Sequence, residues 1–270
     1  MRIYGVDFTS APSARKPITA ARCTATRGRL RVEALEPLPD FPSFERFLRQ
    51  PGPWVGGFDF PFGLPRQAVA DLSWPLEWTR MLGHCRSLGR TEFRRQLDRY
   101  RESRPPGRRY ATRSGDAASG AHPAVKLVNP PVGLMFFEGA WRLASAGLHV
   151  PGLRTARDSR VALEAYPGLL VRRQLAIRAP YKSDSTRKHT AASRDVRRRI
   201  LAALATGRPL GVRVTLEREL GVQASEDGTG DWLDAIVCAV QACWGWMRKD
   251  DRYGLPARVD PIEGWIVSAT

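Results

Sequence analysis

The sequence WVGGFD at residues 54–59 decides the fold class, because it is a short apolar run that ends in an acid. A run of this length is typical of a strand buried on both faces of a sheet. The proline- and glycine-rich sequence FPFGLP at residues 60–65 ends the strand, so we expect Asp59 at its carboxyl end. Residues 3–7, IYGVD, repeat the pattern and place Asp7 at the end of a first strand.

Working outward from these two strands, apolar patterns and turn residues predict the remaining elements. We expect further strands at 18–26, 30–35 and 160–164, and helices at 41–48, 132–148, from 169, at 191–205 and at 231–246. This order predicts an α/β fold with a mixed five-stranded sheet and helices on both faces. We expect one domain over residues 1–270, with a basic helical insertion at about 66–130 between the fourth and fifth strands.

The charge is strongly positive and unevenly distributed. There are 43 basic and 27 acidic residues, for a net charge of +16. Residues 86–113 hold ten arginines against three acids, and residues 182–199 are the second basic stretch. Such concentrated charge attracts polyanions, and nucleic acid is the expected partner. There are two alternative explanations. The basic clusters are solvated helix faces, and the preference for arginine over lysine comes from a GC-rich genome.

Several protein classes are excluded by composition. With 43% hydrophobic residues, the chain is too apolar to be disordered. Its longest charge-free apolar segment, residues 235–247, is shorter than the roughly 20 residues a membrane-spanning helix needs. The four cysteines are too scattered for a disulfide scaffold or a zinc site and predict buried thiols. No secretory signal opens the sequence, so we expect a cytoplasmic protein that does not contact membranes.

Acids in apolar surroundings suggest a metal site. They are Asp7, Asp59, Glu164, Asp231 and Asp234. Buried carboxylates are costly unless they are paired or bind a cation, and strand ends at one edge of a sheet lie close together. Asp231 and Asp234 are three residues apart and share a helix face, although acids at a helix start also favour the helix dipole. Oxygen ligands alone select Mg²⁺ or Mn²⁺, and two ions about 3.5–4 Å apart can hydrolyse a phosphodiester.

The chain also resembles the domain of unknown function 429 (DUF429) family of predicted nucleases, which is similar to the Holliday-junction resolvase branch of the ribonuclease H superfamily. The segments that carry the resemblance are Gly5-Val6-Asp7 and residues 58–65, 164–167, 181–182, 231–235 and 263–266. They imply a ribonuclease H-like (RNase H-like) fold with Asp7 on the first strand and Asp59 on the fourth. The resolvase branch usually has glutamate where Asp59 stands.

The resemblance implies a metal-dependent nuclease for DNA or RNA, with Asp7, Asp59, Asp231 and Asp234 as ligands of two Mg²⁺ or Mn²⁺ ions. Glu164 has no counterpart among the usual ligands of the superfamily, and we expect it to replace or assist one of them. Lys182 either contacts the scissile phosphate or begins a solvated basic helix.

Two other functions compete with the nuclease. One is a nucleic-acid-binding protein of the same fold without catalysis. The other is an actin-like ATPase, whose phosphate loop requires glycine where Thr9 stands.

Overall fold

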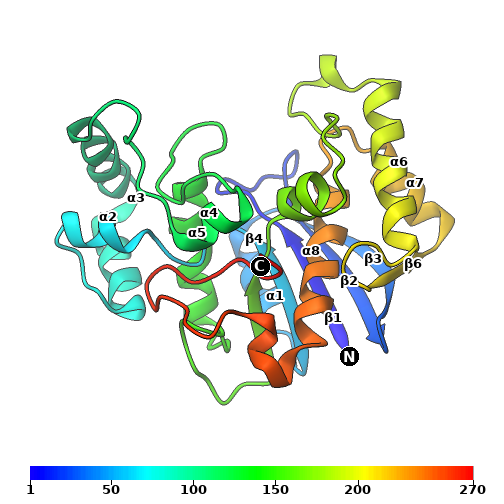
Figure 1. Ribbon diagram of the computed structural model, residues 1–270, viewed down its shortest axis with the longest axis horizontal. Helices are drawn as coiled ribbons and strands as arrows, with labels where there is room; N and C mark the ends of the chain where they lie inside the picture. The colour runs from blue at the N-terminus through cyan, green and yellow to red at the C-terminus, as the bar shows by residue number, and fades with distance from the viewer. Residues whose placement is uncertain (270) are drawn as a thin grey trace.

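Six strands form one mixed sheet in the computed structural model, which describes residues 1–269 (Figure 1). The strand order is β5-β4-β1-β2-β3-β6. The strands are β1 (Arg2–Asp7), β2 (Ile18–Thr26), β3 (Arg29–Leu38), β4 (Trp54–Asp59), β5 (Arg160–Glu164) and β6 (Arg213–Leu216). β1, β2 and β3 are successively antiparallel, whereas β4 pairs in parallel with both β1 and β5.

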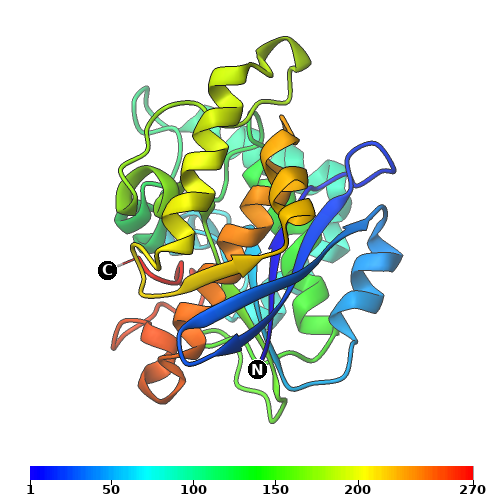
Figure 2. The same cartoon turned by 90° about the vertical axis from the view of Figure 1, so that its right-hand side faces the viewer.

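The expected count of five strands is wrong, because β6 adds a sixth. It pairs in parallel with β3 at the edge of the sheet, which Figure 2 shows as the gold arrow beside the blue strands. β6 is only four residues long, and its register begins with Arg29 opposite Arg213. So short a segment shows too little alternation to be recognised as a strand from sequence.

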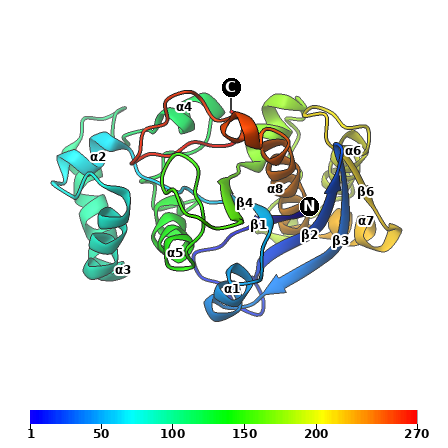
Figure 3. The same ribbon diagram turned by 90° about the horizontal axis from the view of Figure 1, so that it is seen from below.

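Helices cover both faces of the sheet. The helices are α1 (Phe41–Leu48), α2 (Arg66–Asp71), α3 (Trp78–Ser103), α4 (Ser114–Ser119), α5 (Val132–Ser145), α6 (Ala191–Ala205), α7 (Arg218–Glu226) and α8 (Asp231–Trp246). Shorter helical segments are η1 (Leu169–Gln174), η2 (Thr186–Lys188) and η3 (Lys249–Gly254). Figure 3 shows α8 on one face of the sheet and α1 and α5 on the other.

Local sequence explains several boundaries. Asp40 caps α1 by accepting a hydrogen bond from the Ser43 backbone N–H at 2.7 Å. Arg27 and Gly28 both have positive φ, as the tight turn between β2 and β3 requires. Gly89, at φ 73° and ψ 161°, interrupts α3, and the helix therefore bends there.

Two hydrophobic cores lie on opposite faces of the sheet. One is rich in aromatic side chains from β1, β4, α1, α3 and α5, including Trp54, Phe58 and Phe136. The other is aliphatic and lies between the sheet and the helices α6 and α8.

The helix α8 crosses the sheet at very short range. Gly5 and Gly57 are register partners on β1 and β4. A Cβ atom on Gly5 would lie 2.0 Å from the Ala235 carbonyl oxygen, and one on Gly57 would lie 2.4 Å from the Cys238 carbonyl oxygen. Only glycine permits this approach. It brings the start of α8 to the carboxyl ends of β1 and β4.

Helices α2 to α5 lie in the chain between β4 and β5, where the sequence predicts a basic helical insertion. The single domain and the limits of that insertion stay predictions. No helix in residues 1–269 combines the length and apolar character that membrane crossing requires.

Candidate metal centre

Asp7 and Asp59 are the last residues of two neighbouring parallel strands. They are direct register partners, so their backbones lie side by side at one edge of the sheet. Each acid follows its strand glycine, Gly5 or Gly57, by two residues and therefore points to the same face as that glycine. That is the face on which α8 packs.

Asp234 lies in the first turn of α8 and is completely buried. Its Oδ1 accepts a hydrogen bond of 2.7 Å from the Tyr181 hydroxyl, and its Oδ2 accepts one from the Lys182 ammonium. Although burial lowers the pKa of Lys182, the carboxylates around it, with Asp234 foremost, raise that pKa well above its ordinary value. The ion pair with Asp234 therefore favours the protonated form of Lys182, whose side chain is 38% exposed.

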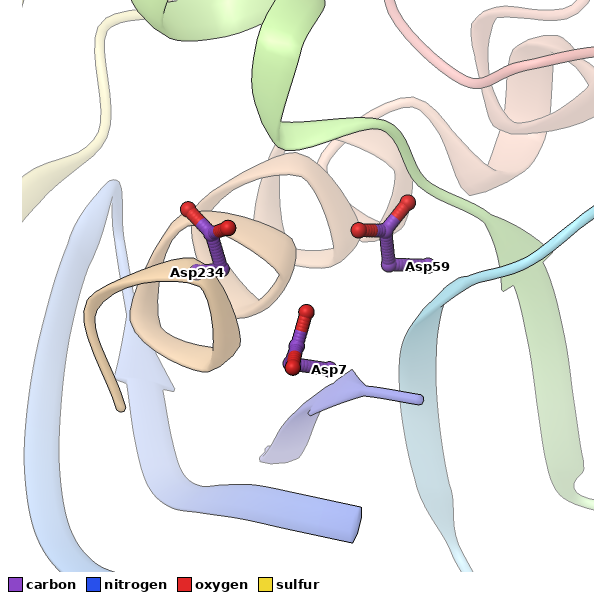
Figure 4. A group of neighbouring side chains, drawn as sticks. All are labelled: Asp7, Asp59 and Asp234. Carbon is purple, nitrogen blue, oxygen red and sulfur yellow. The ribbon is translucent and has the colours of Figure 1, made fainter. Parts of the chain in front are cut away.

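The three aspartates form one cluster. Asp7, Asp59 and Asp234 each offer a carboxylate oxygen, and these oxygens lie within 4.8 Å of one another. Figure 4 shows the three side chains around a common space, one from β1, one from β4 and one from α8. Burial, together with the charges of Asp231 and Asp234, raises the pKa of Asp7 well above its ordinary value. Burial raises the pKa of Asp59 to about 7, although Lys182 opposes the rise.

The donor set fits a hard divalent cation. Within residues 1–269, neither a backbone nor a side-chain group donates a hydrogen bond to the carboxylate of Asp7 or Asp59. Two neighbouring, partly buried carboxylates without hydrogen-bond donors repel each other, and this repulsion is unfavourable unless a cation lies between them. Oxygen ligands without histidine or cysteine suit Mg²⁺ or Mn²⁺.

Asp231 lies beside the cluster. Its carboxylate is not among the oxygens that lie within 4.8 Å of one another in the described residues. The Asp231 carbonyl accepts a 3.0 Å hydrogen bond from the Thr19 hydroxyl, which ties the start of α8 to β2. After burial, its negative charge is the strongest contribution that raises the pKa of Asp7, ahead of the charge of Asp234.

Glu164 is engaged elsewhere, in a buried ion network. The Arg113 guanidinium donates to both of its oxygens, at 2.9 and 2.6 Å, and the Phe62 backbone N–H donates to one of them at 2.9 Å. Arg113 also pairs with Asp116 at 2.6 Å and donates to the Glu263 carbonyl at 2.9 Å. Glu164 therefore has a structural role at the carboxyl end of β5, because all the hydrogen bonds of its carboxylate are to other groups of the chain.

Three features of the site escaped the sequence analysis. Tyr181 lies in the segment 181–182 and Arg113 ends the arginine-rich stretch 86–113, but neither pattern indicates a bond to Asp234 or to Glu164. The third feature is the equal spacing of Gly5-x-Asp7 and Gly57-x-Asp59. This spacing indicates two strands that both approach the same helix closely at a glycine and both end in an acid.

The family model described as "Protein of unknown function (DUF429)" matches residues 5–259. The chain belongs to this family. The match spans Asp7, Asp59, Lys182 and Asp234, so the whole cluster lies within the part of the chain that defines a DUF429 protein. Neither the curated proteins nor the solved structures include a match to the chain.

Proposed function

We propose that this DUF429 protein is a nuclease that depends on Mg²⁺ or Mn²⁺ and hydrolyses phosphodiester bonds of DNA or RNA. The observation that carries the proposal is the convergence of Asp7, Asp59 and Asp234, the first two without hydrogen-bond donors among residues 1–269. In the hydrolysis, a water oxygen bonds to phosphorus, the bond to one ester oxygen breaks, and that oxygen leaves with a proton. A bound divalent ion supplies Lewis-acid polarisation of the phosphate.

We also infer that the fold is RNase H-like. The support is the strand arrangement, in which three antiparallel strands, β1 to β3, are followed by the parallel strands β4 and β5 on the other side of β1. The ribonuclease H fold has the same arrangement. β6 is then an addition to the five strands of that core.

The charge distribution favours nucleic acid as the substrate, although much of the first basic cluster is neutralised within the chain. Six of its arginines form ion pairs: Arg90 with Glu138, Arg94 and Arg101 with Asp98, Arg95 with Glu92, Arg104 with Asp71, and Arg113 with Asp116 and Glu164. Arg86 lies over the Trp141 ring at 4.1 Å.

The segment that follows Lys182 has basic side chains that are not neutralised by acids within the described residues. Arg187 and Lys188 are exposed and form no ion pair within residues 1–269. This segment packs on the loop before α8, because the Ser183 backbone N–H donates to the Gly228 carbonyl at 3.1 Å. Arg187 and Lys188 follow Lys182, which contacts Asp234, by five and six residues, and we propose that they bind the phosphate backbone of a substrate.

The proposal is tested by incubating the purified protein with labelled single-stranded, double-stranded and branched DNA and with RNA, in Mg²⁺ or Mn²⁺. We expect cleavage by the wild type and by Asp195→Asn, whose acid is exposed on α6, and loss of cleavage in Asp7→Asn. Cleavage that persists in Asp7→Asn would exclude this site. Salt-dependent binding without cleavage in either metal would favour the non-catalytic nucleic-acid-binding protein instead.

A further inference from the structure

We infer that Lys182 replaces the second metal ion, so that the site binds one divalent ion between Asp7 and Asp59 and uses the Lys182 ammonium as its other cation. The inference rests on the proposed function and changes the count of two ions that the sequence predicts. It concerns the metal stoichiometry of the site, which is measured without any substrate.

The first argument is that the three aspartates differ in their hydrogen-bond partners. Both oxygens of Asp234 already accept hydrogen bonds, from Tyr181 and Lys182, whereas Asp7 and Asp59 have no donor among residues 1–269. The two acids without donors are also register partners at the ends of parallel strands. One ion between them satisfies both, and Asp234 is satisfied by the chain.

The second argument is that Lys182 is held in place. Buried Arg197 donates a hydrogen bond of 2.6 Å to the Tyr181 carbonyl, and a second of 2.7 Å to the Ser225 carbonyl. A Cβ atom on Gly230 would lie 2.6 Å from the Lys182 Cβ, so the absence of a side chain at Gly230 admits the lysine stem. A lysine anchored at its backbone and stem loses little further freedom when it pairs with Asp234.

The third argument is charge balance. The three clustered carboxylates and the one ammonium leave a net charge equal and opposite to that of one divalent ion, and Asp231 adds a further negative charge beside them. A second divalent ion would lie beside a fixed ammonium, and the repulsion between the two cations opposes its binding. Loss of the ammonium removes this repulsion and leaves the negative charge of Asp234 for a second ion.

The experiment is a titration of the metal-free protein with Mn²⁺ alone. Binding is monitored by calorimetry and by electron paramagnetic resonance. We expect one Mn²⁺ per wild-type chain, with the spectrum of an isolated ion. We expect Lys182→Met to bind two ions whose spins are coupled, since two-metal sites hold their ions about 3.5–4 Å apart. Lys182→Arg keeps the charge and should remain at one ion.

Lys249→Met is the matched control, because it removes an exposed lysine of η3, which follows the opposite end of α8 from Asp234. It should bind one ion with the affinity of the wild type, which separates a local effect from a change in net charge. Two ions in the wild type, or one ion of unchanged affinity in Lys182→Met, would overturn the inference and leave the proposed function standing. A wild-type protein that binds no Mn²⁺ would overturn both. The wild-type stoichiometry decides the matter even if Lys182→Met does not fold.

Discussion

At the scale of single residues, Asp7→Asn should stabilise the metal-free protein while abolishing its response to metal. The substitution removes one of several repelling buried charges, and relief of this kind raises the free energy of unfolding by about 0.5–2 kcal/mol. Thermal unfolding with EDTA should show a higher Tm than the wild type. Added Mn²⁺ should raise the Tm of the wild type and of Asp195→Asn, but not that of Asp7→Asn. A lower Tm in EDTA would mean that the cluster is not repulsive.

Glu164→Gln should behave in the opposite way, with a loss of stability and intact metal binding. Removal of one partner from a buried ion pair costs roughly 3 kcal/mol or more, and here the buried Arg113 keeps Asp116 but loses Glu164, one of its two counter-ions. Urea unfolding should show the loss, while Mn²⁺ calorimetry should give the wild-type stoichiometry. If the variant keeps its stability and loses the ion, Glu164 is a metal ligand and not a structural residue.

The sequence predicted the aspartates of the cluster because each lies where an apolar run begins or ends. It did not predict the partners of Glu164. Arg113 lies 51 residues from Glu164 and 150 from Glu263, in an irregular stretch without periodicity. A contact between such distant residues depends on the folding of the whole chain, and neither spacing nor composition indicates it.

At the scale of elements, the contact of α8 with the sheet fixes the position of Asp234. Gly5→Ala should therefore reduce both stability and metal affinity, because its Cβ would lie 2.0 Å from the Ala235 carbonyl oxygen and 2.2 Å from the Ala239 backbone nitrogen. Forced overpacking costs about 1–3 kcal/mol or more, and the resulting strain lies two residues from Asp7, on the same strand. Chemical denaturation and Mn²⁺ titration measure the two effects.

Gly83→Ala is the control for that substitution. Gly83 lies in α3, and a Cβ there would meet no atom within 4 Å. Removing a helix glycine in open space should stabilise the protein by about 0.4–1 kcal/mol. Equal effects of the two substitutions would show that α8 tolerates a larger distance from the sheet.

Most elements could be predicted from sequence, and the exceptions have a common cause. β1, β2, β4 and β5 are apolar and bounded by turn residues, so pattern alone located them. β6, α2, α4 and α7 were not predicted individually, because they are short and carry mixed polar and apolar residues. Such elements are stabilised by the neighbours against which they pack rather than by their own pattern.

At the scale of the whole molecule, the two basic stretches should differ in their contribution to substrate binding. Arg187→Glu with Lys188→Glu should weaken binding of single-stranded nucleic acid by roughly tenfold and lower the salt dependence by about one unit for each lost phosphate contact. Fluorescence anisotropy over a range of salt concentrations measures both quantities.

The matched double variant is Arg108→Glu with Arg109→Glu, which changes the net charge equally in the loop between α3 and α4. These two arginines are also exposed and form no ion pair within residues 1–269. We expect a much smaller effect from them. If both double variants weaken binding equally, overall charge rather than the segment after Lys182 attracts the nucleic acid.

The structure also shows that the family match stops short of a structural boundary. The match ends at residue 259, but Asp260 pairs with Arg66 at 2.5 Å, and the Glu263 carboxylate accepts hydrogen bonds from the backbone N–H groups of Arg66 and Ser114. The Val267 backbone N–H then donates to the Glu164 carbonyl at 2.8 Å. A gene fragment trimmed at residue 259 should therefore yield aggregated protein, while one that extends through residue 269 should not. Expression libraries designed from family limits alone would discard this chain as unfoldable for want of its last ten or so residues.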